Sequence, residues 1–483
     1  MTNRRDFMKQ SAMTAGIVAL CAGNRKCPAI LKSSVAPDAI SSLRKKLRGR
    51  LIGDKDYETA RAVITMNPKS DRHPAVVAQC ETEEDVVRCI DFAHRHGLEV
   101  AVRSGNCSFL GWGSCDNGLV IDLSRMKSVK PDPIRRTAYS ATGCTAEEVL
   151  ASTVQFGLVP VLGECGIVGA GAALGGGLGW LSGQYGAVCD NLLSARVITA
   201  DGSILTANEN TNEDLFWAIR GGGGNFGVAT QFEYRLHPVR EVLAGSLIYP
   251  ANKARSVLRL FWDFMSTAPD ELQAECYLTT RARGSVSIEL VYAGELEQGE
   301  RLVQGLRKSI PADQDSLKRR KFSELYEMDL ENSAMHYPFE RDKGSYVERL
   351  SDEVIDLAVD RFEQPSHARE LSFNFSHYMH GRVCRIPADA TAFQLRKADA
   401  VHLVFWTQWK DPADGPACMS WLDETFDLLQ PHSGGRIYSN YMSTTGDVAA
   451  RATFGPNYAR LAQLKRKYDP NNFFHLNQNI LPG

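Results

Sequence analysis

The fold is decided at a glycine-dense stretch that begins Arg103-Ser104-Gly105-Asn106-Cys107-Ser108. It directly follows an apolar segment at residues 98–103 that predicts a strand. Two more glycine-dense stretches lie at residues 163–186 and 220–227. Glycine at such density costs chain entropy on folding. Its commonest reason is the close approach of the backbone to a ligand, because main-chain N–H groups in turns can bind the phosphates of that ligand. Tight turns alone would explain one stretch, but three together predict a dinucleotide cradle.

One of these stretches matches a familiar motif in the wrong context. Residues 222–227 satisfy G-x-G-x-x-G, the fingerprint of a nicotinamide-dinucleotide fold. That fingerprint requires a strand before the glycines and a helix after them. Here a helix is expected before and a strand after, so we reject a nicotinamide cofactor.

The first half of the chain mixes helical and strand periodicities. Thr82, Thr145 and Thr211 each precede acidic residues in patterns that predict helix caps, and Gly97 and Gly157 are expected to end the first two helices. Asp201-Gly202 between two alternating runs predicts a hairpin.

After Pro238 the glycine clusters stop and the sequence pattern changes. Strands are expected at residues 243–249, 274–280, 286–292, 371–378 and 401–409, with helices at 253–265 and 299–308. This order fits an antiparallel sheet that carries helices on one face and is free to cover a cofactor with the other. Alternation groups Phe373, Phe375 and His377 on one face against Asn374, Ser376 and Tyr378 on the other, without showing which face meets the cofactor. A final helix is expected at residues 458–468.

The composition is that of an ordinary globular enzyme, with 43% hydrophobic and 23% charged residues. A net charge of −2 gives no footprint for nucleic acid. No apolar run is long enough to predict an integral membrane segment in the mature chain. Twelve cysteines occur without C-x-x-C or ligand spacing, so no metal site is predicted.

The N-terminus predicts export. It reads Arg4-Arg5-Asp6-Phe7-Met8-Lys9, which matches the twin-arginine pattern R-R-x-F-x-K, and an uncharged segment follows at residues 11–23. The alternative is a charged tail with a short amphipathic helix. Because the twin-arginine machinery moves folded proteins, a cofactor can be inserted first, and we expect a periplasmic or extracellular protein.

Taken in order, the motifs resemble the vanillyl-alcohol-oxidase/p-cresol-methylhydroxylase family of FAD enzymes, in its berberine-bridge-enzyme-like branch. Residues 103–108 are similar to the R-S-G-G-H-S pyrophosphate loop, residues 174–180 to a second signature, and residues 468–480 to the closing segment. The resemblance implies an α+β, two-domain PCMH-type FAD-binding fold with an antiparallel-sheet cap domain. The expected divisions are a signal and linker (1–45), an FAD-binding domain (46–241), a substrate or cap domain (242–435) and a C-terminal segment that returns to the FAD domain (436–483).

The same resemblance implies which residues bind FAD. They lie in the glycine stretches and the C-terminal segment: Arg103, Ser104, Gly105, Asn106, Cys107, Ser108, Cys165, Gly169, Gly171, Gly175, Gly176, Gly179, Asp190, Asn191, Gly227, Val228, Asn440 and Asn477.

Two cysteines depart from the family pattern. Cys107 stands where many members tether FAD through a histidine, and Cys165 is close to the position of a second, cysteine tether but one residue displaced. Three alternatives stay open: non-covalent FAD, attachment through Cys165, and attachment through Cys107.

The resemblance also suggests a base. Tyr438-Ser439-Asn440-Tyr441 resembles the branch's Y-x-N-Y element, in which a tyrosine removes the substrate proton. An ordinary tyrosine pKa near 10 is too high for this, so a cation such as Arg436 or a strong donor must lower it. The implied reaction is hydride transfer from an alcohol, sugar or amine C–H bond to flavin N5, with O2 or another acceptor reoxidising the flavin. A dehydrogenase and a non-catalytic flavin-binding protein are the alternatives.

Overall fold

The computed structural model describes residues 35–61, 71–108, 110–280, 285–326, 337, 339–364, 368–441 and 445–483. The proposed export signal therefore lies outside the described residues. Within them, no helix is both long and apolar enough to cross a membrane.

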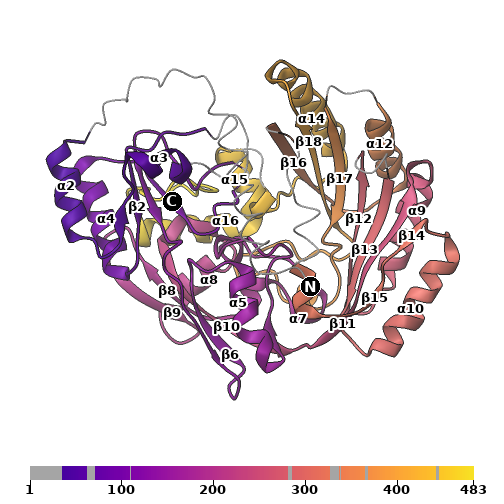
Figure 1. Ribbon diagram of the computed structural model, residues 1–483. Coiled ribbons are helices and arrows are strands. Elements are labelled where there is room, and N and C mark those ends of the chain that lie inside the picture. Colours follow the sequence, from indigo (N-terminus) through magenta and orange to yellow (C-terminus); the bar gives the residue numbers. More distant parts are fainter. Residues whose placement is uncertain are drawn as a thin grey trace.

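The first half of the chain forms two sheets (Figure 1). In the first, of order β1-β2-β4-β3, the strands β2, β4 and β3 run parallel and β1 is antiparallel to β2. Its strands are β1 (Arg50–Leu51), β2 (Val76–Gln79), β3 (Val100–Arg103) and β4 (Leu119–Asp122). The second is antiparallel, with β10 pairing β6, β7 and β8. Its strands are β5 (Val129–Asp132), β6 (Thr137–Ala141), β7 (Leu158–Pro160), β8 (Leu192–Ile198), β9 (Ile204–Asn208) and β10 (Val228–Pro238).

Local sequence explains where the helices of this half begin and end. Thr82 and Thr145 form the expected capping boxes, and Gly97 and Gly157 follow in the left-handed conformation. The expected cap at Thr211 is wrong, because Asn212 is the N-cap residue, at φ 48°, and its side chain donates to Thr206 O instead. The helices are α2 (Pro37–Lys46), α3 (Asp54–Arg61), α4 (Glu83–His96), α5 (Ala146–Thr153), α6 (Gly171–Leu174), α7 (Ser182–Tyr185) and α8 (Glu213–Ile219).

The second half is built on one antiparallel sheet of order β14-β11-β13-β12-β17-β18-β16, with β15 also pairing β11. All five expected strands are present, and β16, which was not expected, adds an edge. The strands are β11 (Glu241–Pro250), β12 (Leu272–Thr279), β13 (Ser285–Tyr292), β14 (Gln314–Asp315), β15 (Lys318–Lys321), β16 (Phe339–Val347), β17 (Glu370–Ser376) and β18 (Val401–Trp409).

Helices cover the outer face of this sheet (Figure 1). In the first of them, α9, apolar residues recur at helical spacing: Val257, Leu258, Phe261 and Met265 are all buried against the sheet. The covering helices are α9 (Ala254–Ser266), α10 (Leu296–Ser309), α12 (Asp352–Glu363) and α14 (Gly415–Leu429). The opposite face is directed toward the first half of the chain, as the sequence predicted.

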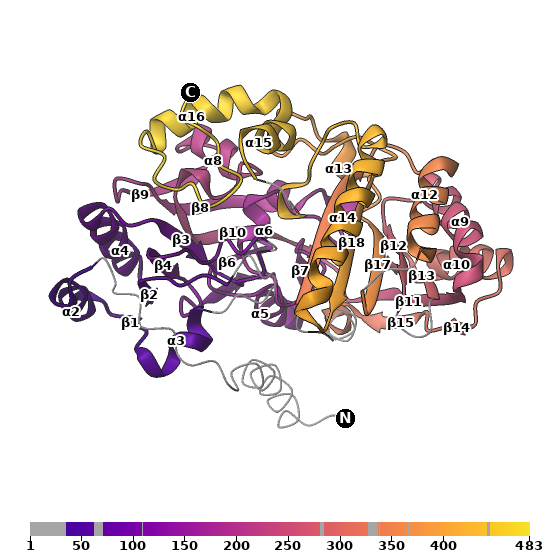
Figure 2. The same ribbon diagram turned by 90° about the horizontal axis from the view of Figure 1, so that it is seen from above.

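The end of the chain returns to the first half. After the short α13 (Arg382–Arg385) come α15 (Asp447–Phe454) and α16 (Tyr458–Tyr468); α16 lies against α8, and α15 packs on α16 (Figure 2). The buried Lys465 ammonium fixes this segment by donating to Asn225 O at 2.8 Å, Asp469 Oδ2 at 2.6 Å and Phe474 O at 2.9 Å. The last residues are thereby placed against the third glycine stretch.

Candidate flavin site

Two of the glycine stretches touch through their backbones. A Cβ atom on Gly105 would lie 2.4 Å from Gly169 N, and one on Gly169 would lie 2.2 Å from Gly105 N, so only glycine fits at either position. Ser104 Oγ links the same stretches, donating to Thr142 O and accepting from Ala170 N at 3.1 Å. The predicted pyrophosphate loop is therefore held against the second stretch.

The two ends of the predicted pyrophosphate loop serve different purposes. Arg103, at the end of β3, donates to Asp122 Oδ2 at 2.8 Å in a buried pair, so its charge fixes the strand end. Asn106 takes a left-handed conformation at φ 61°, and Ser108 Oγ accepts from Trp112 N at 3.2 Å. The backbone of residues 104–108, rather than the arginine, is left to meet a ligand.

Cys107 and Cys165 lie near each other. Burial, and then the charge of Cys165, raise the pKa of the Cys107 thiol to about 12. Its Sγ donates to Gly105 O at 3.2 Å. Cys107 is consequently a neutral thiol at physiological pH, and a neutral thiol is a weak nucleophile.

The glycine run that follows α6 meets the C-terminal segment. A Cβ on Gly175 would lie 1.9 Å from Asn440 Oδ1, while Ser439 Oγ donates to Gly175 O at 2.7 Å. Gly176, at φ 105°, approaches the ring of Phe393 in the same way. These contacts bring Tyr438 and Tyr441 to the glycine run.

Several other predicted cofactor residues use their side chains within the protein. Asp190 forms a buried pair with Arg396 at 2.7 Å, and Asn191 donates to Tyr185 O and Ala187 O. The remaining predicted residues either approach another backbone segment or begin a helix or strand. The backbone of Gly179 lies close to Leu162 O and that of Gly227 close to Ile198 O. Val228 begins β10, and Gly171 begins α6 with no atom within 4 Å of its Cβ position.

A buried polar atom near the third glycine stretch fits a bound cofactor. Asn477 Nδ2 donates to Phe474 O at 3.0 Å, but its Oδ1 is buried and has no hydrogen-bond partner among the described residues. Asn479 Oδ1 is in the same condition. Buried acceptors of this kind are costly unless a donor satisfies them, and a flavin nucleotide carries such donors. Together with the glycine contacts, they fit FAD along this surface.

The two tyrosines of the C-terminal element are buried beside two histidines. The ring centroids of Tyr438 and Tyr441 are 5.6 Å apart, and His402 lies 5.4 Å from the first and 4.8 Å from the second. Burial raises the pKa of both phenols, although the hydrogen bond from Asn440 Nδ2 at 3.0 Å opposes this at Tyr438. Arg436, the candidate cation, is not among the causes that shift the pKa of either phenol; it only partly opposes the rise that burial causes in the pKa of Tyr346. The expected lowering by Arg436 is therefore wrong.

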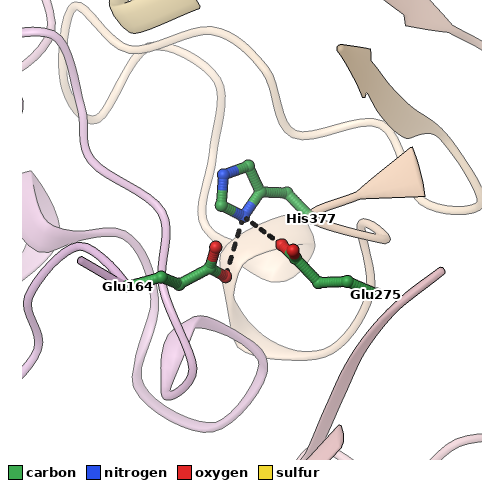
Figure 3. A group of neighbouring side chains, drawn as sticks. All are labelled: Glu164, Glu275 and His377. Carbon is green, nitrogen blue, oxygen red and sulfur yellow. Dashed lines mark ion pairs between the residues drawn. The ribbon is translucent and has the colours of Figure 1, made fainter. Parts of the chain in front are cut away.

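Next to these rings lies a carboxyl–imidazole cluster, whose three residues Figure 3 shows. His377 Nδ1 is 3.2 Å from Glu164 Oε1 and 3.7 Å from Glu275 Oε1. Glu164 comes from the second glycine stretch, Glu275 from β12, and His377 follows β17. His377 is 6.0 Å from the ring centroids of both tyrosines, so the cluster adjoins the predicted base.

His377 corrects the expected alternation on β17. Phe373 and Phe375 face the helix-covered core, as one set, but His377 has φ 48° and leaves that face. Asn374 donates to Glu275 Oε2 at 3.0 Å, which places Asn374 and His377 on the same, site-facing side. Tyr378 joins the core in exchange.

Glu164, Glu275, His377 and His402 were not predicted as site residues. Glu275 is the one charged residue of β12, and Glu164 stands beside Cys165 in a glycine stretch, so each carried a signal. The histidines carried none, because isolated histidines are usually structural.

Comparisons with known proteins agree with this geometry. Residues 74–208 match the FAD binding domain family, and residues 437–481 match the berberine and berberine like family. The FAD-linked oxidoreductase pgmH of Aspergillus terreus is 30% identical, over 93% of this chain and 97% of its own.

Solved structures share the fold. That of 6-hydroxy-D-nicotine oxidase from Arthrobacter nicotinovorans superposes with a TM-score of 0.82 at 25% identity, covering 90% of this chain and 98% of that chain. A berberine bridge enzyme variant in complex with (S)-reticuline reaches a TM-score of 0.82 at 20% identity, covering 93% of this chain and 99% of that chain.

Proposed function

Since the chain belongs to the FAD-linked oxidoreductases that carry a berberine-like C-terminal segment, we propose that it is an oxidase of an alcohol, sugar or amine. FAD-dependent oxidoreductase activity is shown by the relatives, and the oxidase assignment and substrate classes are our proposal. The observation that carries it is the meeting of Gly105 with Gly169, and of Gly175 with Asn440, beside two buried tyrosines.

FAD, when bound, supplies an acceptor for the hydride of a substrate C–H bond. The backbone of residues 104–108 and the glycine run would hold it, with Asn477 Oδ1 as a further acceptor. The site-facing side of the large sheet then closes over the reacting bond and excludes water. Tyr438, which accepts a hydrogen bond from Asn440, is oriented to take up a substrate proton.

Oxygen use separates this proposal from the two alternatives. We expect flavin reduced by substrate to be reoxidised rapidly by O2 in stopped-flow absorbance, with stoichiometric hydrogen peroxide. Slow reoxidation by O2 but fast reoxidation by an artificial acceptor would identify a dehydrogenase. Protein that binds FAD but is reduced by no alcohol, sugar or amine would be a flavin-binding protein without turnover.

We propose further that FAD is bound without a covalent tether. The Cys107 thiol keeps its proton up to a pH well above neutral, so little of the thiolate that would attack the flavin is present. Acid precipitation should then leave the yellow colour in the supernatant. A yellow pellet would contradict this, and Cys107→Ala compared with Cys165→Ala would locate the attachment.

The export proposal rests on the sequence at Arg4-Arg5 alone. We expect the mature protein outside the cytoplasm, and Arg4→Lys/Arg5→Lys to retain it inside. Unchanged export of that variant in cell fractions would contradict use of the twin-arginine machinery.

A further inference from the structure

A run of positive charge lies at residues 44–50, here called the basic segment. It begins in the last turn of α2 and ends in β1. Five of its seven residues are basic and none is acidic, although the whole chain has a net charge of −2: Arg44, Lys45, Lys46, Arg48 and Arg50. All five of these side chains are exposed.

Little of this charge is balanced by a carboxylate. Among the residues that the structure describes, the first four basic side chains of the segment form no ion pair, and Arg50 reaches only Asp56, with 3.6 Å between their Nη1 and Oδ2 atoms. The basic run of β15 is different, because Arg319 pairs there with Glu297 and Glu300 at 3.0 and 2.8 Å. The basic segment is therefore a surface of uncompensated positive charge.

The backbone that carries these cations is fixed. Leu43 is buried in the core beneath α2, and Asp85 at the start of α4 accepts from Arg48 N at 2.8 Å and from Gly49 N at 2.9 Å. Only glycine fits at position 49, because a Cβ atom there would lie 2.0 Å from Gln79 O. A partner that binds this segment consequently does not have to order a loose tail first.

Local helix chemistry accounts for only part of the charge. Basic residues in the last turn of a helix interact favourably with its dipole, which gives a local reason for the cations at residues 44–46 of α2. Arg48 and Arg50 lie beyond the end of that helix, so its dipole gives no reason for them.

The basic segment lies at the outer edge of the molecule. In both views α2 is at the end of the first half that is away from the large sheet (Figure 1 and Figure 2). A partner on this surface would therefore not cover the site-facing side of the large sheet.

The residue types of the segment indicate the kind of partner. Residues 35–51 contain no aromatic side chain on which a nucleic-acid base could stack. Successive residues of a helix point about 100° apart, so the three basic residues of α2 spread to different sides and do not line one groove. Leu43 and Leu47 pack into the protein, so neither is offered for insertion into a bilayer. Spread, flexible cations of this kind fit a plane of mobile phosphate headgroups.

We infer that the basic segment is a membrane-association surface, which holds the folded protein against anionic lipid headgroups by charge alone. This inference goes beyond the proposed function and does not depend on it. Each Lys or Arg close to an anionic membrane surface strengthens association about fivefold. The association should be reversible and sensitive to salt, because the Debye length shortens from about 10 Å at 0.1 M ionic strength to about 3 Å at 1 M.

The test is cosedimentation of the full-length, FAD-loaded protein with lipid vesicles. At about 0.1 M salt we expect binding to vesicles of phosphatidylcholine rich in phosphatidylglycerol, and none to vesicles of phosphatidylcholine alone. Binding to the anionic vesicles should be lost at about 1 M salt. The variant Arg44→Gln/Lys45→Gln/Lys46→Gln/Arg48→Gln should bind the anionic vesicles roughly several hundredfold more weakly than wild type.

The matched control is Arg255→Gln/Arg259→Gln/Arg307→Gln/Arg319→Gln. It removes the same amount of positive charge, but from exposed residues of the second half that pair with carboxylates, and it should bind as wild type does. FAD absorbance and urea unfolding check that both variants fold. If the first does not fold, Lys45→Gln/Lys46→Gln replaces it, with an expected loss of roughly 25-fold.

Three results would overturn the inference. The first is no binding of wild type to the anionic vesicles at about 0.1 M salt. The second is an equal loss of binding in the basic-segment variant and the control. The third is tighter binding to double-stranded DNA than to the anionic vesicles at equal phosphate concentration, which would assign the surface to nucleic acid. Because the readout is sedimentation, a protein that proved not to be an oxidase would be tested equally well.

Discussion

Replacing Lys465 by methionine should detach the end of the chain. Its ammonium is fully buried, donates three hydrogen bonds and neutralises Asp469, which is also fully buried. Methionine keeps most of the apolar stem but leaves Asp469 charged without a cation and two carbonyls without a donor. Removing one partner of a buried pair costs about 3–5 kcal/mol, which corresponds to a rise in the open population of roughly a hundredfold to several thousandfold.

Lys467→Met is the control for this change. Lys467 also pairs with an aspartate, Asp214, at 2.6 Å, but its side chain is 57% exposed. An exposed pair contributes about 1 kcal/mol or less. Urea unfolding, limited proteolysis of the C-terminal segment and FAD retention should therefore separate the two variants clearly.

The double variant Lys465→Met/Asp469→Leu tests the reasoning itself. Removing both charges leaves no uncompensated carboxylate, so the double variant should lose less stability than the sum of the single changes. Equal stability of Lys465→Met and wild type, or additive losses in the double variant, would refute the argument.

Three further predictions address the cradle, the base and pH. Gly105→Ala should lose FAD because its Cβ would lie 2.4 Å from a neighbouring backbone nitrogen, whereas Gly171→Ala, with open space at that position, should keep it; equal FAD content by absorbance would contradict this. Tyr438→Phe should bind FAD normally but reduce it on the order of 100-fold more slowly in stopped flow, and a wild-type rate would exclude a role in proton transfer. Burial lowers the pKa of His237 from 6.5 to about 4. Between these pH values the imidazole is protonated in the unfolded chain but remains neutral in the native protein. Stability present above pH 6.5 should thus decrease toward pH 4 by on the order of 3 kcal/mol, and urea titrations of His237→Gln, which should lack that decrease, check it.

The sequence was informative where local rules act alone. The capping boxes at Thr82 and Thr145, the hairpin at Asp201-Gly202 and the strands of the large sheet follow from neighbouring residues, and the structure has them. The glycine pattern predicted close approaches of the backbone, but it did not indicate that Gly105 would meet Gly169.

The remainder depends on residues far apart in the chain. The left-handed His377 is not predictable from its neighbours, and it moves the imidazole to the opposite face of the sheet. The raised pKa of Glu275 depends first on its burial in the folded sheet and then on the charge of Glu164, more than a hundred positions earlier. Arg436 was a reasonable partner for the two tyrosines because it is close to them in sequence. In the folded protein its charge instead opposes the burial-driven rise in the pKa of Tyr346.

The return of the C-terminal segment also determines when, during synthesis, the FAD surface is completed. A nascent chain emerges from its N-terminus and its domains generally fold as units during synthesis. The surface that receives FAD is completed by Ser439 on Gly175 and by Ile480, whose N–H donates to Asn225 Oδ1 at 3.0 Å, so its last part forms only after residue 480 has been synthesised. Any signal at residues 4–9 is exposed long before that moment. An export route that accepts only folded proteins would place synthesis first, FAD binding second and passage across the membrane last.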